Sequence, residues 1–239
     1  MTAVKVGCCG FPVARHEYFR LFDLVEVQQT FYQPPRLETV RRWRETAPPG
    51  FTFTLKAWQL ITHPPSSPTY RRLRQPLPPQ ARNAYGHFRP TPEVFAAWTR
   101  TLEIARALAA PLVVLQCPAS LRPSAENVAN LRAFFTRIPR DDLRLAWEPR
   151  GAWPPSLVAQ LCQELDLIHC VDPFKDAPQH GEIYYFRLHG RTGYDYRYSD
   201  AELQAVLAQV GKRPAFVLFN NKAMLDDALR CKRLLATLS

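Results

Sequence analysis

Charged side chains stand at two-residue spacing near the ends of several short apolar runs. Arg187 and His189 close the run IYYFRLH, Glu148 closes LRLAWE, and Glu26 precedes Gln28 in LVEVQQ. In a strand, side chains two residues apart point to the same face. Carboxylates and a histidine on one face support general acid–base chemistry, while arginine binds anionic groups through its fork of donors. These residues predict a site for an anionic substrate, provided that the fold brings the strand ends together.

Eight short runs rich in β-branched and aromatic residues predict the strands that position these side chains. Helical patterns separate most of them, and Ser199 followed by Glu202 predicts a capping box at the start of one helix. The segment PFKDAPQHGE after the sixth run shows no helical pattern. The expected strands are Val4–Cys9, Leu24–Gln29, Phe51–Ala57, Leu112–Cys117, Leu143–Glu148, Leu167–Asp172, Ile183–His189 and Ala215–Asn220.

Alternating strands and helices indicate parallel pairing with right-handed crossovers, and eight strands are the number that closes a (β/α)8 TIM barrel. We therefore expect an α/β protein with a single TIM-barrel domain over residues 1–239. A doubly wound open sheet is the alternative. It is disfavoured because GCCGFP, after the first strand, is not the glycine-rich phosphate turn typical of that fold.

Strand parity divides the side chains into an apolar outward set and a polar inward set. In the third strand, Phe53 and Leu55 oppose Thr54 and Lys56, and the second, fifth, seventh and eighth strands divide similarly. Active sites of these barrels lie at the C-terminal mouth. We expect the catalytic residues there to be Glu26, Glu148 and His189. The expected substrate-binding residues are Gln28, Tyr32, Lys56, His63, Gln116, Arg150, Asp172, Arg187, Arg191, Tyr196 and Asn220.

A long basic segment interrupts the pattern after the third strand. The chain has a net charge of +10, and no acidic residue occurs between Thr46 and Pro92. Such a long connection is unusual in a compact domain and often functional. We expect residues 58–92 to form a basic lid or arm at the mouth, which attracts an anionic small molecule or nucleic acid.

The remaining composition excludes several classes of protein. The six cysteines form no C-x-x-C pair and are expected to be buried thiols. No apolar run approaches the roughly 20 residues of a membrane helix, and the start lacks the apolar core of a secretory signal. A cytoplasmic protein with no membrane partner is therefore expected. No cofactor is expected either, although a divalent ion held by Glu148, Asp172 and His189 is an alternative that no H-x-x-x-H spacing supports.

Several longer motifs are similar to those of a known family. They are VEVQQTFYQPP, TVRRWRETAPPGFTFTLKA with ITH after it, LQCPASL, WEPRGAW, FRLHGR with YDYRYS, and FNNKAMLDDALRCKRLL. The chain resembles the YecE-like family, known as domain of unknown function 72, over nearly its whole length. The opening GCCGF and the pair Gln28–Gln29 depart from the family pattern. The resemblance implies a TIM barrel and no established activity.

Three functions fit these residues. A hydrolase of a phosphate-bearing or other anionic substrate would bind the anion through Arg187, Arg191 and Lys56. Its general base would be Glu148 or Glu26, and its acid His189. A glycoside hydrolase would use Glu26 and Glu148 as its carboxylate pair. A non-catalytic nucleic-acid-binding protein would use the basic arm and neighbouring tyrosines. The structural alternatives are ion pairs of Glu26 with Lys56 and of Glu148 with Arg150.

Overall fold

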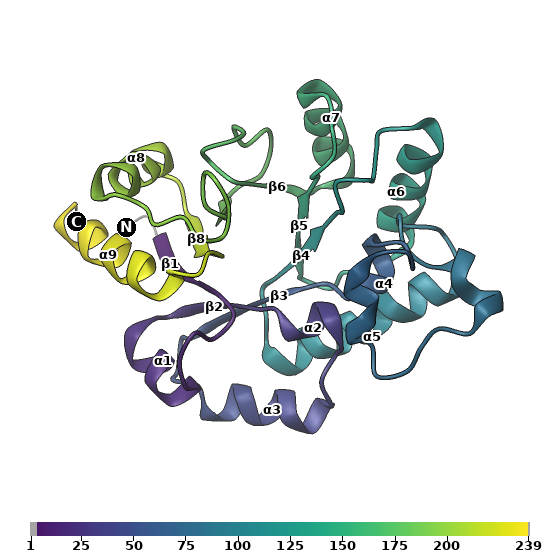
Figure 1. Cartoon of the computed structure of the whole chain (residues 1–239), viewed down its shortest axis with the longest axis horizontal. Helices are drawn as coiled ribbons and strands as arrows, with labels where there is room; N and C mark the ends of the chain where they lie inside the picture. Colours follow the sequence, from purple (N-terminus) through teal and green to yellow (C-terminus); the bar gives the residue numbers. More distant parts are fainter. Residues whose placement is uncertain (1–3, 239) are drawn as a thin grey trace.

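The computed structural model describes residues 4–238, and eight parallel strands form a closed barrel at its centre (Figure 1). The strands pair in sequence order, and β1 pairs with β8 to close the ring. The predicted TIM barrel is thus confirmed. Residues 1–3 and 239 of the expected domain lie outside the described residues. The strands are β1 (Val4–Cys9), β2 (Leu24–Val27), β3 (Thr52–Lys56), β4 (Leu112–Gln116), β5 (Arg144–Glu148), β6 (Ile168–Val171), β7 (Tyr184–Leu188) and β8 (Ala215–Phe219).

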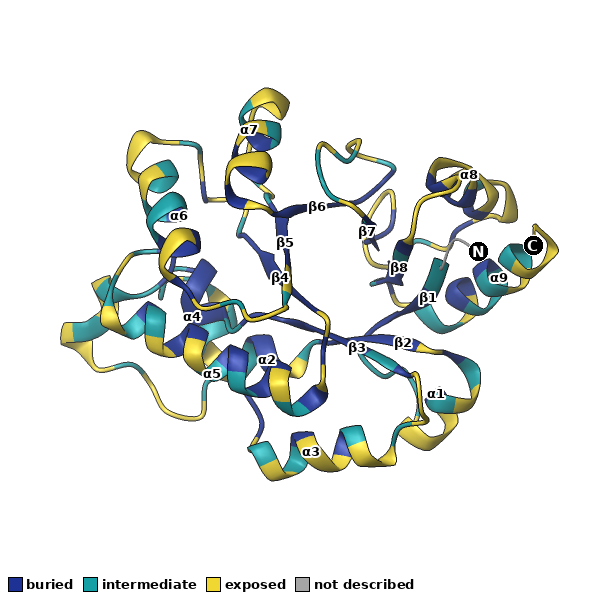
Figure 2. Cartoon of the chain, turned by 180° about the vertical axis from the view of Figure 1, so that it is seen from behind, coloured by how far each residue is buried: buried dark blue, intermediate teal, exposed yellow. Residues whose placement is uncertain are grey.

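Helices surround this barrel, with their exposed faces turned outward and the strands buried inside (Figure 2). Ser199 and Glu202 form the predicted capping box. As expected, no helix connects β6 to β7 within the described residues. The helices are α1 (Arg15–Leu21), α2 (Gln29–Tyr32), α3 (Leu37–Thr46), α4 (Gln59–Thr62), α5 (Pro92–Leu108), α6 (Ala125–Arg137), α7 (Pro155–Leu165), α8 (Asp200–Val210) and α9 (Met224–Thr237). Two 3-10 turns are η1 (Pro68–Arg72) and η2 (Pro79–Ala84).

Two apolar layers follow the predicted parity. Val25, Phe53 and Leu55 belong to the large layer between the strands and the helices. Leu24 and Val114 belong to a smaller layer inside the barrel. The inner layer fills the barrel beneath the mouth. Inward-facing polar side chains near the strand ends therefore lie above this layer, at the C-terminal end of the barrel. All six cysteines are free and buried, as predicted.

The basic segment 58–92 is anchored at both of its ends. Gly86 N donates to Leu60 O at 2.8 Å and Phe88 N donates to Ile61 O at 2.9 Å. The guanidinium of Arg72 lies 4.1 Å from the ring centre of Tyr32, at the end of α2. Figure 1 shows the segment at one side of the barrel, beside α4 and α5. The segment therefore lies at the rim of the barrel as an arm, and a role as a lid over the mouth stays a prediction.

None of the helices within residues 4–238 is both long and apolar enough to cross a membrane.

Candidate functional site

Arg187 joins two carboxylates inside the barrel. Its Nε and Nη2 donate to the two carboxylate oxygens of Glu26 at 3.0 and 2.8 Å, and its Nη1 donates to Oε2 of Glu148. Arg187 and Glu26 are wholly buried, and Glu148 is 5% exposed. Bidentate arginine–carboxylate pairs are both strong and geometrically specific. This triad ties β7 to β2 and β5, and it forms the floor of the mouth.

Glu26 accepts two further hydrogen bonds. The Tyr185 hydroxyl donates to Oε2 at 2.7 Å, and the Gln28 amide donates to Oε1. Tyr185 in turn lies 2.8 Å from the Thr54 hydroxyl. Both oxygens of Glu26 are thus hydrogen-bonded, and none of its surface is exposed. The catalytic role of Glu26, alone or paired with Glu148 in a glycosidase, stays a prediction.

Arg187 carries its charge in the interior of the barrel. Burial opposes its charge, but the carboxylates of Glu148 and Glu26 outweigh that effect and raise the pKa of Arg187 well above its usual value. Each of its three nitrogens already donates to a carboxylate. The residue is thus a permanent interior cation with no open surface for a ligand. Arg187 is held between Glu26 and Glu148, and direct binding of an anion by Arg187 stays a prediction.

Glu148 ends β5 and faces the mouth. Its Oε1 accepts from the Gln116 amide at 3.0 Å and lies 2.9 Å from Nε of Arg150. Burial alone would raise the pKa of Glu148, but Arg187, His189 and Arg150 together hold it well below its usual range. Glu148 is therefore a fixed anion in the mouth, surrounded by hydrogen-bond donors.

His189 stands beside this carboxylate. Its Nε2 lies 3.3 Å from Oε1 of Glu148, and the Asn220 amide donates to Nδ1 at 3.0 Å. With Nδ1 accepting, the ring proton belongs on Nε2, which is buried without a well-formed hydrogen bond. Burial lowers the pKa of His189, although Glu148 opposes the change. His189 thus presents a neutral ring with an N–H directed at Glu148.

Asp172 holds the backbone at the end of β6. One carboxylate oxygen accepts from Phe174 N at 3.1 Å and the other from His189 N at 3.2 Å. Both oxygens therefore serve the link between β6 and β7 and help to place His189. Within residues 4–238, no group of three His, Cys, Asp or Glu side chains is arranged to hold a metal ion. The alternative ion site of Glu148, Asp172 and His189 thus gains no support from the geometry.

Lys56 ends β3 and is 6% exposed. Its Nζ lies 3.4 Å from the ring centre of Phe31, and it forms no ion pair or hydrogen bond with any described residue. The expected pair of Glu26 with Lys56 is wrong, because Arg187 occupies Glu26. Burial first, and then the charge of Arg187, lower the pKa of Lys56 to about 7.

His63 packs edge-to-face against Phe31, with a distance of 4.8 Å between ring centres. Its Nδ1 is 2.7 Å from the Thr62 hydroxyl. Burial and the neighbouring cations, Lys56 first among them, lower the pKa of His63 to about 3. The ring is therefore neutral and extends the wall of the mouth next to Lys56.

A cavity of about 360 Å³ opens beside Glu148 and His189. Its other polar lining residues are Arg150, His169, Asp172, Lys175 and Asp176. Sequence reasoning missed His169, Lys175 and Asp176. His169 has outward parity in β6, and Lys175 lies in a loop where strand parity gives no direction. The cavity gives the Glu148–His189 pair access to a small ligand.

The family of the chain follows from the match to a family model. The model described as protein of unknown function DUF72 matches residues 14–239. The chain belongs to the DUF72 family. This confirms the resemblance seen in the motifs. No curated protein matches the chain.

Solved structures of DUF72 proteins share the whole architecture. One from Enterococcus faecalis V583 is 22% identical with a TM-score of 0.75, covering 99% of this chain and 98% of that one. Another, from Thermotoga maritima MSB8, is 20% identical with a TM-score of 0.71, covering 98% and 99%. Endonuclease IV from Thermus thermophilus is 14% identical with a TM-score of 0.59, covering 98% of both chains. At these identities the likeness shows the fold alone.

Three predicted residues of this DUF72 chain lie apart from the Glu148 cluster. Arg191 and Tyr196 both bind Oε1 of Glu202 in α8, at 3.0 and 2.6 Å. Tyr32 lies at the rim beneath the arm, and a ligand role for all three stays a prediction. Gly190 makes the turn that separates this loop from β7. Its φ is +84°, and a side chain there would meet Gly193 O at 2.0 Å.

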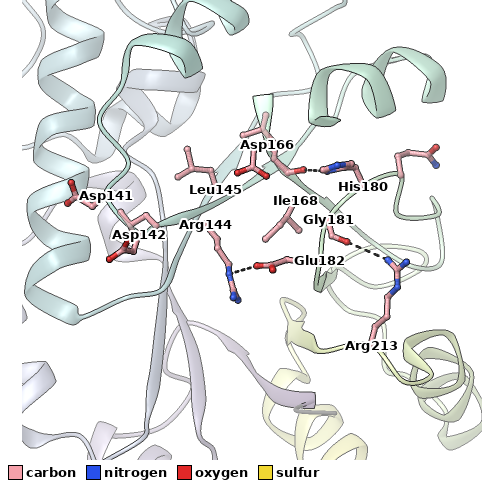
Figure 3. A pocket seen from close by; sticks show the side chains of 13 residues that line it. Asp141, Asp142, Arg144, Leu145, Asp166, Ile168, His180, Gly181, Glu182 and Arg213 are labelled. Carbon is pink, nitrogen blue, oxygen red and sulfur yellow. Dashed lines mark hydrogen bonds and ion pairs between the residues drawn. The ribbon is translucent and has the colours of Figure 1, made fainter. Parts of the chain in front are cut away.

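A larger cavity of about 670 Å³ lies at the opposite end of the DUF72 barrel (Figure 3). It is formed around the first residues of β5, β6 and β7, and Arg144 pairs with Glu182 across it at 2.5 Å. Arg213 on its wall donates to Gly181 O. This is the N-terminal face, where contacts in such barrels serve stability rather than catalysis. None of the predicted site residues lines it.

Proposed function

We propose that the mouth of this barrel is an active site that hydrolyses a small anionic substrate, with a phosphate ester as the preferred class. The observation that carries the proposal is that two cationic side chains of the mouth have donors left without an acceptor. Lys56 has no carboxylate partner among the described residues. Arg150 uses only Nε on Glu148 and leaves both Nη atoms without a hydrogen bond to residues 4–238. Arginine forks fit phosphate oxygens closely.

Arg150 is placed to bind such a ligand. Its side chain is 34% exposed, and it lines the same cavity as Glu148 and His189. The ion pair with Glu148 fixes its orientation while its terminal nitrogens stay open. A phosphate or carboxylate group in the cavity would therefore receive two hydrogen bonds from a preoriented guanidinium.

Glu148 and His189 supply the polar groups for hydrolysis. Because Glu148 stays ionised, it orients a water molecule by accepting a hydrogen bond from it. The N–H of His189 Nε2 holds Glu148 from one side, and the open Nη atoms of Arg150 donate to the negative charge that develops on the attacked group. Fixed donors of this kind lower reaction barriers strongly. Phosphoryl transfer depends mainly on positioning and electrostatic stabilisation, so a strong base is not required.

Hydrolysis of a panel of phosphate monoesters tests this proposal. Wild-type protein should release inorganic phosphate from at least one small ester. Glu148→Gln should lower kcat by about 100-fold or more, the size typical of losing one catalytic polar group. Asp176→Asn is a suitable control, because Asp176 lines the same cavity without contacting Glu148. Equal rates in the wild type and Glu148→Gln would contradict the assignment.

Nucleic-acid binding by the arm is a second candidate function. The observation that favours it is a cavity of about 590 Å³ in the arm, lined by Arg71, Arg82, Arg89 and Tyr70 among other residues. Arginines together with an aromatic ring suit the phosphates and bases of a single strand. This function needs no chemistry at Glu148, so the Glu148→Gln protein should keep it.

A further inference from the structure

We propose that His169 and Lys175 form a second binding subsite in the mouth cavity, which takes the carboxylate of a substrate that also carries a phosphate ester. The inference rests on the proposed function, because the phosphate of that substrate is the anion assigned to Arg150. It adds a substrate class, the small phosphorylated hydroxy acids, and two binding residues on the β6 side of the cavity.

The first support is that His169 faces the cavity because no helix covers β6. Within the described residues, the connection from β6 to β7 is a loop (Figure 1). This loop returns beside the strand, where the backbone N–H of His169 donates to His180 O at 2.9 Å. His169 is 6% exposed and lines the cavity of about 360 Å³ together with Glu148 and Arg150. An outward-facing side chain of β6 is therefore part of the cavity wall.

The second support is the hydrogen bonding of the His169 ring. Its Nδ1 accepts from the backbone N–H of Gln179 at 3.1 Å. Because a backbone N–H can only donate, Nδ1 carries no proton, and the neutral ring holds its proton on Nε2. This Nε2 forms no hydrogen bond with residues 4–238 and is not sealed from solvent, unlike Nε2 of His189. His169 therefore presents a fixed and unused N–H donor to the cavity.

The protonation of His169 agrees with this role. Burial lowers its pKa to about 4, although Asp176 and Glu148 act in the opposite direction. The ring is therefore neutral at physiological pH, and it contributes a hydrogen bond rather than a charge.

Lys175 supplies a positive charge on the same wall. It lies in the turn after β6, where its backbone N–H donates to Asp172 O at 2.9 Å. Its side chain is exposed, lines the cavity and forms no ion pair with residues 4–238. The carboxylate of Asp172 accepts from two backbone N–H groups, and that of Asp176 is exposed and unpaired. The ammonium of Lys175 is thus available to a ligand.

The charges of the cavity select the substrate class. Arg150 and Lys175 are its cationic lining residues, and they follow β5 and β6 respectively. Two cations on neighbouring loops suit two anionic groups of one ligand. The guanidinium of Arg150 fits phosphate oxygens with its two open donors. The ammonium of Lys175 and the single N–H of His169 suit a carboxylate, which accepts at both of its oxygens.

Calorimetric titration with phosphonates, which are not hydrolysed, tests the subsite. Phosphonoacetate and 3-phosphonopropionate carry a carboxylate, whereas ethylphosphonate and propylphosphonate lack it. The better of the two carboxylate ligands should bind about tenfold or more tightly than its alkyl counterpart, the effect of a charge-assisted hydrogen bond. The neutral 2-hydroxyethylphosphonate should bind like the alkyl ligands. If it binds as tightly as the carboxylate ligands, the subsite does not select a carboxylate.

Variants of His169 and Lys175 locate the preference. His169→Asn keeps an acceptor for the N–H of Gln179 but lacks a donor at the position of Nε2, so it should lose most of the preference. His169→Gln places an amide N–H near that position and should restore it. Lys175→Gln should also weaken the preference, whereas Lys212→Gln, which replaces an exposed lysine elsewhere, should leave it unchanged.

The outcomes separate this inference from the proposed function. Equal affinity for carboxylate and alkyl ligands, with binding that Arg150→Ala abolishes, would overturn the subsite and leave the anion site standing. A preference for the carboxylate that persists in both His169→Asn and Lys175→Gln would overturn the assignment to these residues. Failure of every phosphonate to bind would instead overturn the anion site on which both proposals rest.

Discussion

The guanidinium of Arg187 on β7 binds both carboxylate oxygens of Glu26 on β2, at 2.8 and 3.0 Å, in the sealed interior of the barrel. The same side chain donates to Glu148. One buried cation is thereby shared by two carboxylates, and Glu26 forms its ion pair with Arg187 rather than with Lys56. The open charges of the mouth are thus a consequence of the interior triad.

Replacing Arg187 should destabilise the fold strongly. Arg187→Met leaves Glu26 and Glu148 buried without their cation, and removing one partner of a buried ion pair typically costs about 3–5 kcal/mol. Denaturant unfolding measures the change. Arg191→Gln, which breaks an ion pair of a half-exposed arginine, should cost far less stability than Arg187→Met. If Arg187→Met loses no more stability than Arg191→Gln, the triad does not support the barrel.

Replacing Lys56 should stabilise the protein. The pKa of Lys56 falls from 10.5 to about 7 on folding, so the unfolded chain binds more protons between these pH values. The contribution of Lys56 to the free energy of unfolding therefore rises with pH from about 7 to 10.5. Below pH 7 the full cost of burying its ammonium group is present. Lys56→Met removes that cost and should raise Tm by about 2 °C or more at pH 6. The gain should shrink toward pH 10; a lower Tm at pH 6 would show that the ammonium stabilises the fold.

Replacing Glu148 should change the titration of His189. Glu148 opposes the effect of burial on the His189 ring, so Glu148→Gln should lower the pKa of His189 further. The ring signals in NMR spectra recorded against pH measure this directly. The signals of exposed His16 on α1 serve as the internal control and should keep their positions. An unchanged or raised pKa of His189 would mean that the two side chains do not interact in solution.

Replacing arginines of the arm should weaken binding of single-stranded oligonucleotides. The triple variant of Arg71, Arg72 and Arg74 to alanine should lower the affinity and flatten its dependence on salt, because each phosphate contact contributes about 0.7 to the logarithmic slope. A control with the same loss of charge replaces Arg41, Arg42 and Lys212, which are exposed elsewhere. Absence of binding at low salt, or equal slopes in both variants, would remove the second candidate function.

Strand composition and parity were enough to predict the barrel, the mouth and most residues that gather there. Parity tells that Glu26 and Arg187 point inward, but it does not tell how deep each side chain lies. The long Arg187 side chain reaches Glu26 across the barrel and displaces the expected pairing with Lys56. Tyr185 shares the parity of Arg187, yet a tyrosine within an apolar run is expected to be a residue of the hydrophobic core. Arg191 and Tyr196 lie in a loop, where no periodicity indicates direction.

The most direct test of an anion site at the C-terminal mouth is calorimetric titration with inorganic phosphate of the wild type, Arg150→Ala and Arg213→Ala. Arg213 is the matched control, because it is an arginine on the wall of the larger cavity at the other end of the barrel (Figure 3). The wild type and Arg213→Ala should bind phosphate alike, and Arg150→Ala should lose at least tenfold in affinity, since a charge-assisted hydrogen bond contributes about 1.5–3 kcal/mol. Binding that survives in Arg150→Ala and disappears in Arg213→Ala would contradict the account.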